Sequence, residues 1–212
     1  MTNDVQILNN GYPMPAVGLG VYKIADEQME EVVRTALDAG YRAFDTAYFY
    51  GNEKALGSAL KQSNIERDEL FITSKLWNDY QGYDQTIEYF NKSLDNLGLD
   101  YLDLFLIHWP CENDQLYIES YKALEHLYEE GKIKAIGVCN FKIHHLEKLM
   151  RETKITPQVN QIELHPYFNQ QDVQDFCDEH DIKVTAWMPL MRNKGLLDDP
   201  VITDIAHRYD KT

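Results

Sequence analysis

The chain has 212 residues, of which 44% are apolar and 26% are charged, as is usual for one globular domain with a sizeable core. Its formal net charge is −15, and such an acidic surface repels phosphate backbones, so we expect no nucleic acid partner. Three scattered cysteines, a polar N-terminus and the lack of long apolar runs argue against a disulfide scaffold, a signal peptide and a membrane span. These features predict a cytoplasmic location and no membrane partner.

The first segments predict a hairpin, a strand and a helix. Residues 5–16 have the pattern of an N-terminal β-hairpin, because the turn sequence Asn9-Asn10-Gly11 separates two short strand-like runs. A strand is expected over Val17 to Tyr22. The helix after it is expected to begin near Asp26, as its N-cap, and to end at Gly40.

The alternation of strands and helices then continues to residue 209. Further apolar strands are expected at 43–46, 70–74, 102–107, 134–138, 158–162 and 183–187, each followed by a stretch with helical spacing. Strands recur at about 25–33 residues, which is the period of a parallel (β/α)8 TIM barrel. A doubly wound sheet shares the alternation, but it needs Gly-x-Gly-x-x-Gly after its first strand. Here Gly18-Leu19-Gly20 is followed by Val21-Tyr22-Lys23, so the α/β class with barrel architecture is favoured.

Only seven barrel strands are recognisable, and the last β/α unit is missing. We therefore expect residues 1–212 to form a single, incomplete barrel domain. Because a barrel removes its sheet edges only by closing, the first and last strands would keep unpaired edges. Such edges favour pairing with another chain, and we expect self-association through them.

Ionisable side chains stand at the ends of three successive strands, where barrel enzymes carry their chemistry. Asp45 and Tyr50 follow the second strand, Lys75 the third and His108 the fourth. Asp45 could instead cap a turn, Tyr50 could pack at the surface and His108 could be a core histidine. Lys75 in a barrel mouth needs an anionic partner, and Asp45 is available. Four such side chains at matching strand ends favour a catalytic site.

These residue types suit the delivery of a proton to a carbonyl oxygen. A tyrosine hydroxyl has a pKa of about 10, and a nearby ammonium lowers that pKa and makes Tyr50 a better acid. Asp45 would keep Lys75 charged, and His108 could donate a hydrogen bond to the carbonyl oxygen of a small-molecule substrate. No nucleophile is needed if a cofactor supplies hydride.

A metal-dependent barrel hydrolase is an alternative from another reaction class. The histidines that could serve it are His108, His144, His145 and His165. They form no recognisable ligand motif, and the cysteines add none. We therefore expect no metal site.

The chain resembles the aldo-keto reductase family over about Pro13 to Tyr209. The resemblance is carried by four stretches, which are Leu37 to Ala47 with Tyr50 to Glu53, Leu102 to Pro110, Gly137 to Phe141, and Gln158 to Glu163. It implies an oxidoreductase that reduces aldehydes or ketones to alcohols with NADP(H), Tyr50 being the proton donor. Asp45 and Lys75 would then tune Tyr50, and His108 would orient the substrate.

The resemblance also implies binding residues. Those for the cofactor are Gly20, Val21, Tyr22, Asn140, Gln161, Trp187, Pro189 and Leu190, and those for the substrate are Trp77 and Trp109 beside His108. Asn140 and Gln161 would bond the nicotinamide carboxamide, and Trp187 would stack on the ring. As alternatives, Asn140 could cap the helix that follows Phe141, and Trp187 could be ordinary core.

The chain departs from the family pattern at three places. Cys139 and Met188 stand where the family often has serine. The family's last strand and helices, with the cluster that holds the adenosine 2′-phosphate, have no counterpart, and such a site should bind NADP(H) weakly. A second hypothesis is therefore a truncated, catalytically impaired relative with weak or no cofactor binding.

Overall fold

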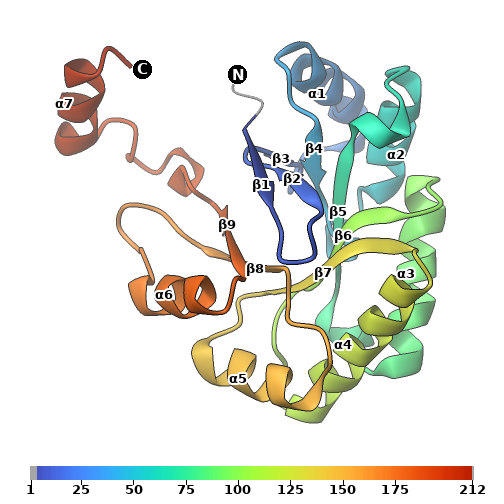
Figure 1. The fold of residues 1–212 in the computed structure, drawn as a ribbon. Helices are drawn as coiled ribbons and strands as arrows, with labels where there is room; N and C mark the ends of the chain where they lie inside the picture. The colour runs from blue at the N-terminus through green and yellow to red at the C-terminus, as the bar shows by residue number, and fades with distance from the viewer. Residues whose placement is uncertain (1–3, 212) are drawn as a thin grey trace.

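A seven-stranded parallel sheet organises the computed structural model, which describes residues 4–211 (Figure 1). Each strand pairs with the next one along the chain. The strands are β3 (Leu19–Gly20), β4 (Ala43–Asp45), β5 (Phe71–Leu76), β6 (Leu102–Ile107), β7 (Ile133–Cys139), β8 (Val159–Glu163) and β9 (Lys183–Trp187). The predicted parallel barrel architecture with seven strands is confirmed. The predicted domain range of 1–212 stays a prediction, and its residues 1–3 and 212 lie outside the described residues.

A helix follows each strand of the sheet, as βαβ units require. The helices are α1 (Asp26–Asp38), α2 (Glu53–Gln62), α3 (Tyr83–Leu97), α4 (Asp114–Glu129), α5 (Ile143–Glu152), α6 (Gln171–Glu179) and α7 (Pro200–Arg208). Short 3₁₀ turns are η1 (Tyr48–Tyr50), η2 (Arg67–Glu69), η3 (Asn78–Tyr80) and η4 (Met191–Asn193). In Figure 1, α7 stands apart from the helices that cover the sheet. Within residues 4–211 no helix has the length and apolar character needed to cross a bilayer.

A hairpin closes the amino-terminal end of the barrel. It consists of β1 (Val5–Ile7) and β2 (Pro13–Pro15), which pair antiparallel. The Asn9 amide donates to the carbonyls of Pro157 and Asp181, at 3.1 Å each, and its oxygen accepts from Gln158 at 2.9 Å. These partners precede β8 and β9, so the hairpin is fixed where the strands begin. The opposite, carboxyl ends of the strands stay accessible.

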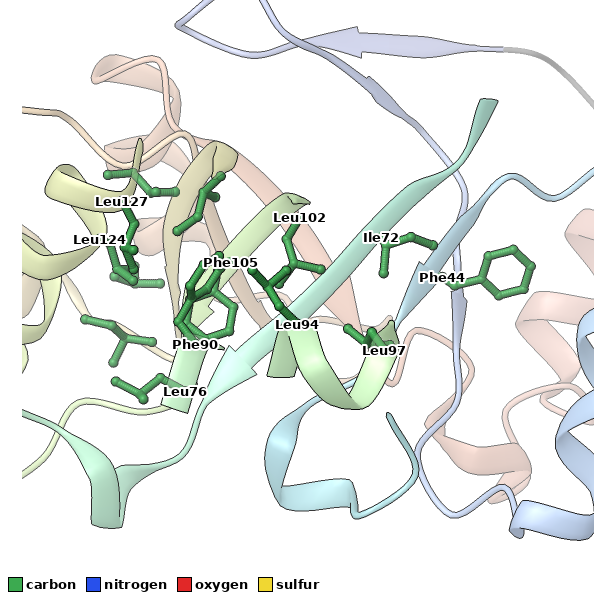
Figure 2. Close-up of a cluster of buried hydrophobic side chains, with 14 of the residues drawn as sticks. Phe44, Ile72, Leu76, Phe90, Leu94, Leu97, Leu102, Phe105, Leu124 and Leu127 are labelled. Carbon is green, nitrogen blue, oxygen red and sulfur yellow. The ribbon is translucent and has the colours of Figure 1, made fainter. Parts of the chain in front are cut away.

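The main core lies between the sheet and its helices (Figure 2). Leu94 and Leu97 of α3 and Leu124 and Leu127 of α4 belong to it, together with buried residues of β4, β5 and β6. Every residue of β5 and β6 is buried, as expected for strands covered on both faces. This packing fixes the central strands, and with them the residues at their ends.

The two edges of the described sheet are β3 and β9. The predicted strand over residues 17–22 is wrong in length, because β3 covers only two residues. β3 pairs only with β4 in the described sheet. A strand with one neighbour has fewer interstrand hydrogen bonds to hold its ends than a strand with two. All five residues of β9 are half-buried, unlike those of β5. Within residues 4–211 the sheet is therefore open between β3 and β9.

The predicted N-cap of the first helix is wrong, and so is the alternative in which Asn140 caps a helix. Ala25 is the N-cap of α1, and Asp26 is its first helical residue. There its negative carboxylate interacts favourably with the positive end of the helix dipole. The N-cap of α5 is Lys142 rather than Asn140. Asn140 has a left-handed backbone with φ of 63°, and its side chain bonds other strand ends, so it is not free to cap the helix.

Gly57 marks a close approach of α2 to the end of α3. A Cβ at this position would lie 2.2 Å from the Leu97 carbonyl oxygen, so the two helices would have to separate. We expect Gly57→Ala to lower the free energy of unfolding by about 3 kcal/mol, the upper range for overpacking. Urea unfolding measures this loss. Ser58→Ala, on the exposed side of the same helix, should stay near the parent value, and equal stability of both variants would contradict the packing argument.

Candidate active site

A cavity of about 950 Å³ opens at the carboxyl ends of the strands and extends along the gap between β3 and β9. Its walls include Gly20 of β3, all five residues of β9 and part of the hairpin. The cavity therefore occupies the open side of the barrel as well as its mouth. Its volume is within the range usual for ligand sites.

A buried ion pair lies at one wall of this cavity. Lys75, in β5, is fully buried, and its Nζ donates to Asp45 Oδ1 and, at 2.8 Å, to the Thr46 carbonyl. Asp45 is the last residue of β4 and lines the cavity. The adjacent parallel strands bring the two side chains together, and the pairing predicted from the sequence is present.

Tyr50 lies against this pair. It ends the turn η1, and the following Gly51 is left-handed with φ of 73°, a conformation that glycine adopts without strain. The Tyr50 ring centroid is 5.1 Å from Lys75 Nζ and 5.7 Å from the His108 ring centroid. The Tyr22 ring also packs against Tyr50, with the two ring centroids 4.7 Å apart. Tyr50 is half-buried and faces the cavity.

The expected lowering of the Tyr50 pKa is not the net result. Burial raises the pKa of Tyr50 by more than Lys75 lowers it, and Asp45 adds to the rise. Burial alone would lower the pKa of Lys75, but the attraction of Asp45, with smaller effects of Tyr50 and Cys139, raises it. At neutral pH the tyrosine is therefore protonated and the lysine is charged.

His108 lies beside Tyr50 at the end of β6. Burial, with a smaller repulsion from Lys75, lowers its pKa to about 3, so the imidazole is neutral at physiological pH. Its Nδ1 is buried and has no hydrogen-bond partner among the described residues, while Trp77 contacts the ring edge-on at 5.3 Å between centroids. A neutral imidazole can orient a ligand by one donor and one acceptor.

Asn140 connects three strand ends. Its Nδ2 donates to the His108 carbonyl at 3.0 Å, and its Oδ1 accepts from Trp187 Nε1 at 2.8 Å. Its backbone N–H donates to the Gln161 carbonyl at 2.9 Å. The Trp187 indole is thereby fixed at the cavity wall, where one face can carry a planar ring.

The other predicted residues divide into two groups. Gly20, Tyr22, Asn140, Gln161, Trp187, Pro189, Trp77 and Trp109 line the cavity with Asp45, Tyr50 and His108. Val21 and Leu190 are not among the lining residues; Val21 is fully buried in the core, and Leu190 is 57% exposed. Their predicted contacts with a cofactor therefore have no support from the cavity.

Phe49 and Arg192 are among the lining residues that the sequence patterns missed. Phe49 stacks on Trp77 with ring centroids 3.8 Å apart, and Arg192 lies over the Tyr22 ring at 5.5 Å. Phe49 precedes the catalytic candidate Tyr50 directly, which is the only signal that could have singled it out. Arg192 follows β9 in an irregular segment, and no spacing pattern marks it.

The histidines of the metal alternative are dispersed in the structure. His108 lies at the end of β6 and His165 follows β8, while His144 and His145 are on α5. Within the part of the chain that the structure describes, no three His, Cys, Asp or Glu side chains gather in a way that could hold a metal ion.

Comparison with known proteins identifies the relatives of this chain. A model of the aldo/keto reductase family matches residues 16–212. The glyoxal reductase of Bacillus subtilis (strain 168) is 48% identical over 210 residues, which are 99% of this chain and 75% of the relative. The methylglyoxal reductase DkgA of Escherichia coli (strain K12) is 46% identical over 97% of this chain and 74% of its own length.

A solved structure extends the comparison to the fold and the cofactor. It is a mutant of Gox0644 in complex with NADPH, which superposes with a TM-score of 0.93 at 40% identity and covers 100% of this chain and 76% of that one. The predicted cofactor, NADP(H), is thus the cofactor found in this family. The chain belongs to the aldo/keto reductase family and is an NAD(P)H-dependent oxidoreductase by that membership.

Proposed function

We propose that this chain reduces small aldehydes and ketones to alcohols with NADPH, with Tyr50 as the proton donor. The observation that carries the proposal is the buried Lys75–Asp45 pair beside Tyr50 and His108 at one cavity wall. Such a set delivers a proton and stabilises developing negative charge. Because two relatives are named glyoxal and methylglyoxal reductases, α-oxoaldehydes such as methylglyoxal are the proposed substrates.

The cavity residues fit a nicotinamide cofactor. Trp187 offers a planar apolar face held by Asn140, and the buried His108 Nδ1 lacks a partner among the described residues. Gly20 and Tyr22 line the same cavity, and Gly20, which has no side chain, leaves open space there for the cofactor. Arg192 and Lys23 bring positive charge to it, as phosphate groups require. NADPH, when bound, would supply the hydride to the carbonyl carbon.

Proton delivery is assigned to the chain's own side chains. Tyr50 is protonated at neutral pH, because a tyrosine hydroxyl has a pKa of about 10 and burial raises the pKa of Tyr50 further, so the donor form is available. As its Oη gives the proton to the carbonyl oxygen, Lys75 stabilises the resulting phenolate at close range. Asp45 holds Lys75 in the charged state that this requires.

His108 is assigned to substrate orientation as a neutral imidazole. Since its pKa is lowered to about 3, we expect it to cause no inflection in kcat/KM between about pH 5 and 8, where an ordinary histidine titrates. A pH profile of methylglyoxal reduction checks this. An inflection near pH 6.5 that disappears in His108→Gln would show that the imidazole titrates during turnover.

The competing hypothesis is a relative with weak or no cofactor binding. The open side of the sheet between β3 and β9 favours it, because within residues 4–211 no further strand forms a wall of the cavity there. Titration of NADPH into the purified chain, followed by addition of methylglyoxal, distinguishes the active reductase from the impaired relative. Micromolar binding with turnover supports the reductase, whereas no binding at millimolar NADPH supports the impaired relative.

We also propose that two copies associate through the edges of β3 and β9. Each of these strands pairs on one side only within residues 4–211, and unpaired edges favour intermolecular pairing. Sedimentation equilibrium should give a concentration-dependent dimer. A monomer at all concentrations would overturn this proposal without affecting the reductase assignment.

The cytoplasmic location expected from the sequence stays a prediction. Cys111, Cys139 and Cys177 are free thiols, and the latter two are buried. Free thiols suit a reducing compartment. Cell fractionation with an antibody to the chain tests the location.

A further inference from the structure

Gln161 bonds the ion pair rather than facing only the cofactor cavity. It lies on β8 and is 7% exposed. Its Nε2 donates to Asp45 Oδ2 at 2.9 Å, although the two residues come from opposite parts of the sheet. The family resemblance implies contact of Gln161 with the nicotinamide, and it does not account for this bond.

The orientation of the Gln161 amide follows from its neighbours. An ionised carboxylate only accepts hydrogen bonds, so the amide nitrogen must face Asp45. The amide oxygen then faces Cys139, whose Sγ lies 3.7 Å away. Burial raises the pKa of Cys139, so the thiol keeps its proton and can donate to that oxygen. Both ends of the amide are thereby fixed.

The Asp45 carboxylate is consequently held at both oxygens. Lys75 binds Oδ1 and Gln161 binds Oδ2. Lys75 also donates to the Thr46 carbonyl, so its ammonium does not depend on Asp45 alone for position. The Asp45 side chain is 24% exposed at the cavity wall. Because Lys75 already holds Oδ1, Gln161 supplies the second donor, which fixes Oδ2 and offsets part of the negative charge of the partly exposed carboxylate.

We propose that Gln161 is a positioning residue for proton delivery, which orients the Asp45 carboxylate, offsets part of its negative charge and so sets how readily Tyr50 releases its proton. This inference rests on the proposed function of Tyr50 and deepens it. Gln161 acts through Asp45 and Lys75, and in this role it does not need to touch the substrate.

The inference predicts a direction for the effect on Tyr50. The titratable groups facing Tyr50 are Asp45 from β4, Lys75 from β5, His108 after β6, Cys139 from β7 and Tyr22 after β3. Without the Gln161 donor, the negative charge of Asp45 is less compensated, and Asp45 already raises the pKa of Tyr50. Removing the donor should therefore raise the pKa of Tyr50 further.

The test is the titration of Tyr50 in ¹³C-tyrosine-labelled protein, with the resonance assigned through Tyr50→Phe. Gln161→Met keeps the length of the side chain and removes the donor, and Gln161→Glu places a carboxylate against Asp45. We expect the Tyr50 pKa to rise by about half a unit or more in the first variant, and further in the second. Asn160→Ala is the matched control, since Asn160 on the same strand donates to the Phe141 carbonyl instead.

The companion measurements are kcat for methylglyoxal and the Kd of NADPH. We expect Gln161→Met to lower kcat about twofold to threefold for each half unit by which the Tyr50 pKa rises, because the rate of proton donation falls as the pKa of the acid rises. An unchanged Tyr50 titration in both Gln161 variants, with only the Kd of NADPH raised, overturns the inference and leaves the reductase proposal intact. Conversely, full turnover by Tyr50→Phe overturns the reductase mechanism, while the Tyr50 titration still reports whether Gln161 acts on the pair.

Discussion

Tyr50→Phe is expected to lower kcat for methylglyoxal reduction about 10³-fold, within the range for loss of a general acid. The phenylalanine ring retains the packing against Tyr22 and His108 but has no proton to give. The Kd of NADPH should change little, because the hydroxyl serves the carbonyl oxygen. Steady-state NADPH consumption and a separate binding titration measure the two quantities.

Tyr48→Phe is the matched control for this variant. Tyr48 belongs to the same turn, but it packs edge-on against Tyr80 and Tyr89, with centroids 5.5 Å and 5.0 Å away. Its loss of a hydroxyl should leave kcat near the parent value. Turnover by Tyr50→Phe at the same rate as Tyr48→Phe would remove Tyr50 from the mechanism.

Asp45→Asn is expected to lower the free energy of unfolding by about 3 kcal/mol at neutral pH, the lower range for breaking a buried ion pair. The variant leaves the fully buried ammonium of Lys75 without its counter-ion. Urea unfolding at neutral pH gives the loss. The double variant Asp45→Asn/Lys75→Met removes both charges and should be more stable than Asp45→Asn alone. The opposite order of stability would contradict the buried-pair argument.

The same variant should change the pH dependence of stability. In the parent chain the pKa of Lys75 is raised, so its contribution is fully present below about pH 10.4 and is lost only as the pH rises through the folded-state value. In Asp45→Asn burial acts without the counter-ion and lowers that pKa. The unfolded state then binds more protons, so stability should rise with pH up to about 10.4.

The difference in unfolding free energy between Asp45→Asn and the parent isolates this effect, since other groups titrate in both. It should shrink between about pH 7 and 10. In the double variant, which has no Lys75, the corresponding difference should stay constant. A constant difference for Asp45→Asn itself would mean that Lys75 is not the group left unpaired.

The sequence predicted the strand ends well because each candidate follows an apolar run. Asp45 ends β4, Lys75 is the next-to-last residue of β5 and His108 follows β6. Chain order alone places neighbouring parallel strands side by side. The Lys75–Asp45 pair was predictable for the same reason. Residue type and position were sufficient there.

Contacts between distant segments could not be predicted in this way. Gln161 and Asp45 are 116 residues apart, and no periodic pattern connects them. Asp103, inside the otherwise apolar β6, is another case, since its partners Arg67 and Tyr12 lie 36 and 91 residues away. Such partners depend on how the sheet curves and where the hairpin inserts.

The direction in which the pKa of Tyr50 shifts could not be predicted from the sequence either. The residue types indicate that Lys75 lowers it, but the depth of burial decides the outcome, and burial is the larger influence. The length of β3 was misjudged for a related reason, since it depends on having one neighbouring strand rather than two. Both the pKa of Tyr50 and the length of β3 therefore depend on neighbouring segments of the fold and not only on the residues themselves.

The central claim is that the cavity at the strand ends carries out carbonyl reduction. It is tested most directly by adding methylglyoxal and NADPH to the purified chain and measuring NADPH consumed against alcohol formed. We expect one alcohol for each NADPH with the parent chain, and no alcohol above background with Tyr50→Phe. Bound NADPH without alcohol formation by the parent chain, or equal alcohol formation by both, would contradict the claim.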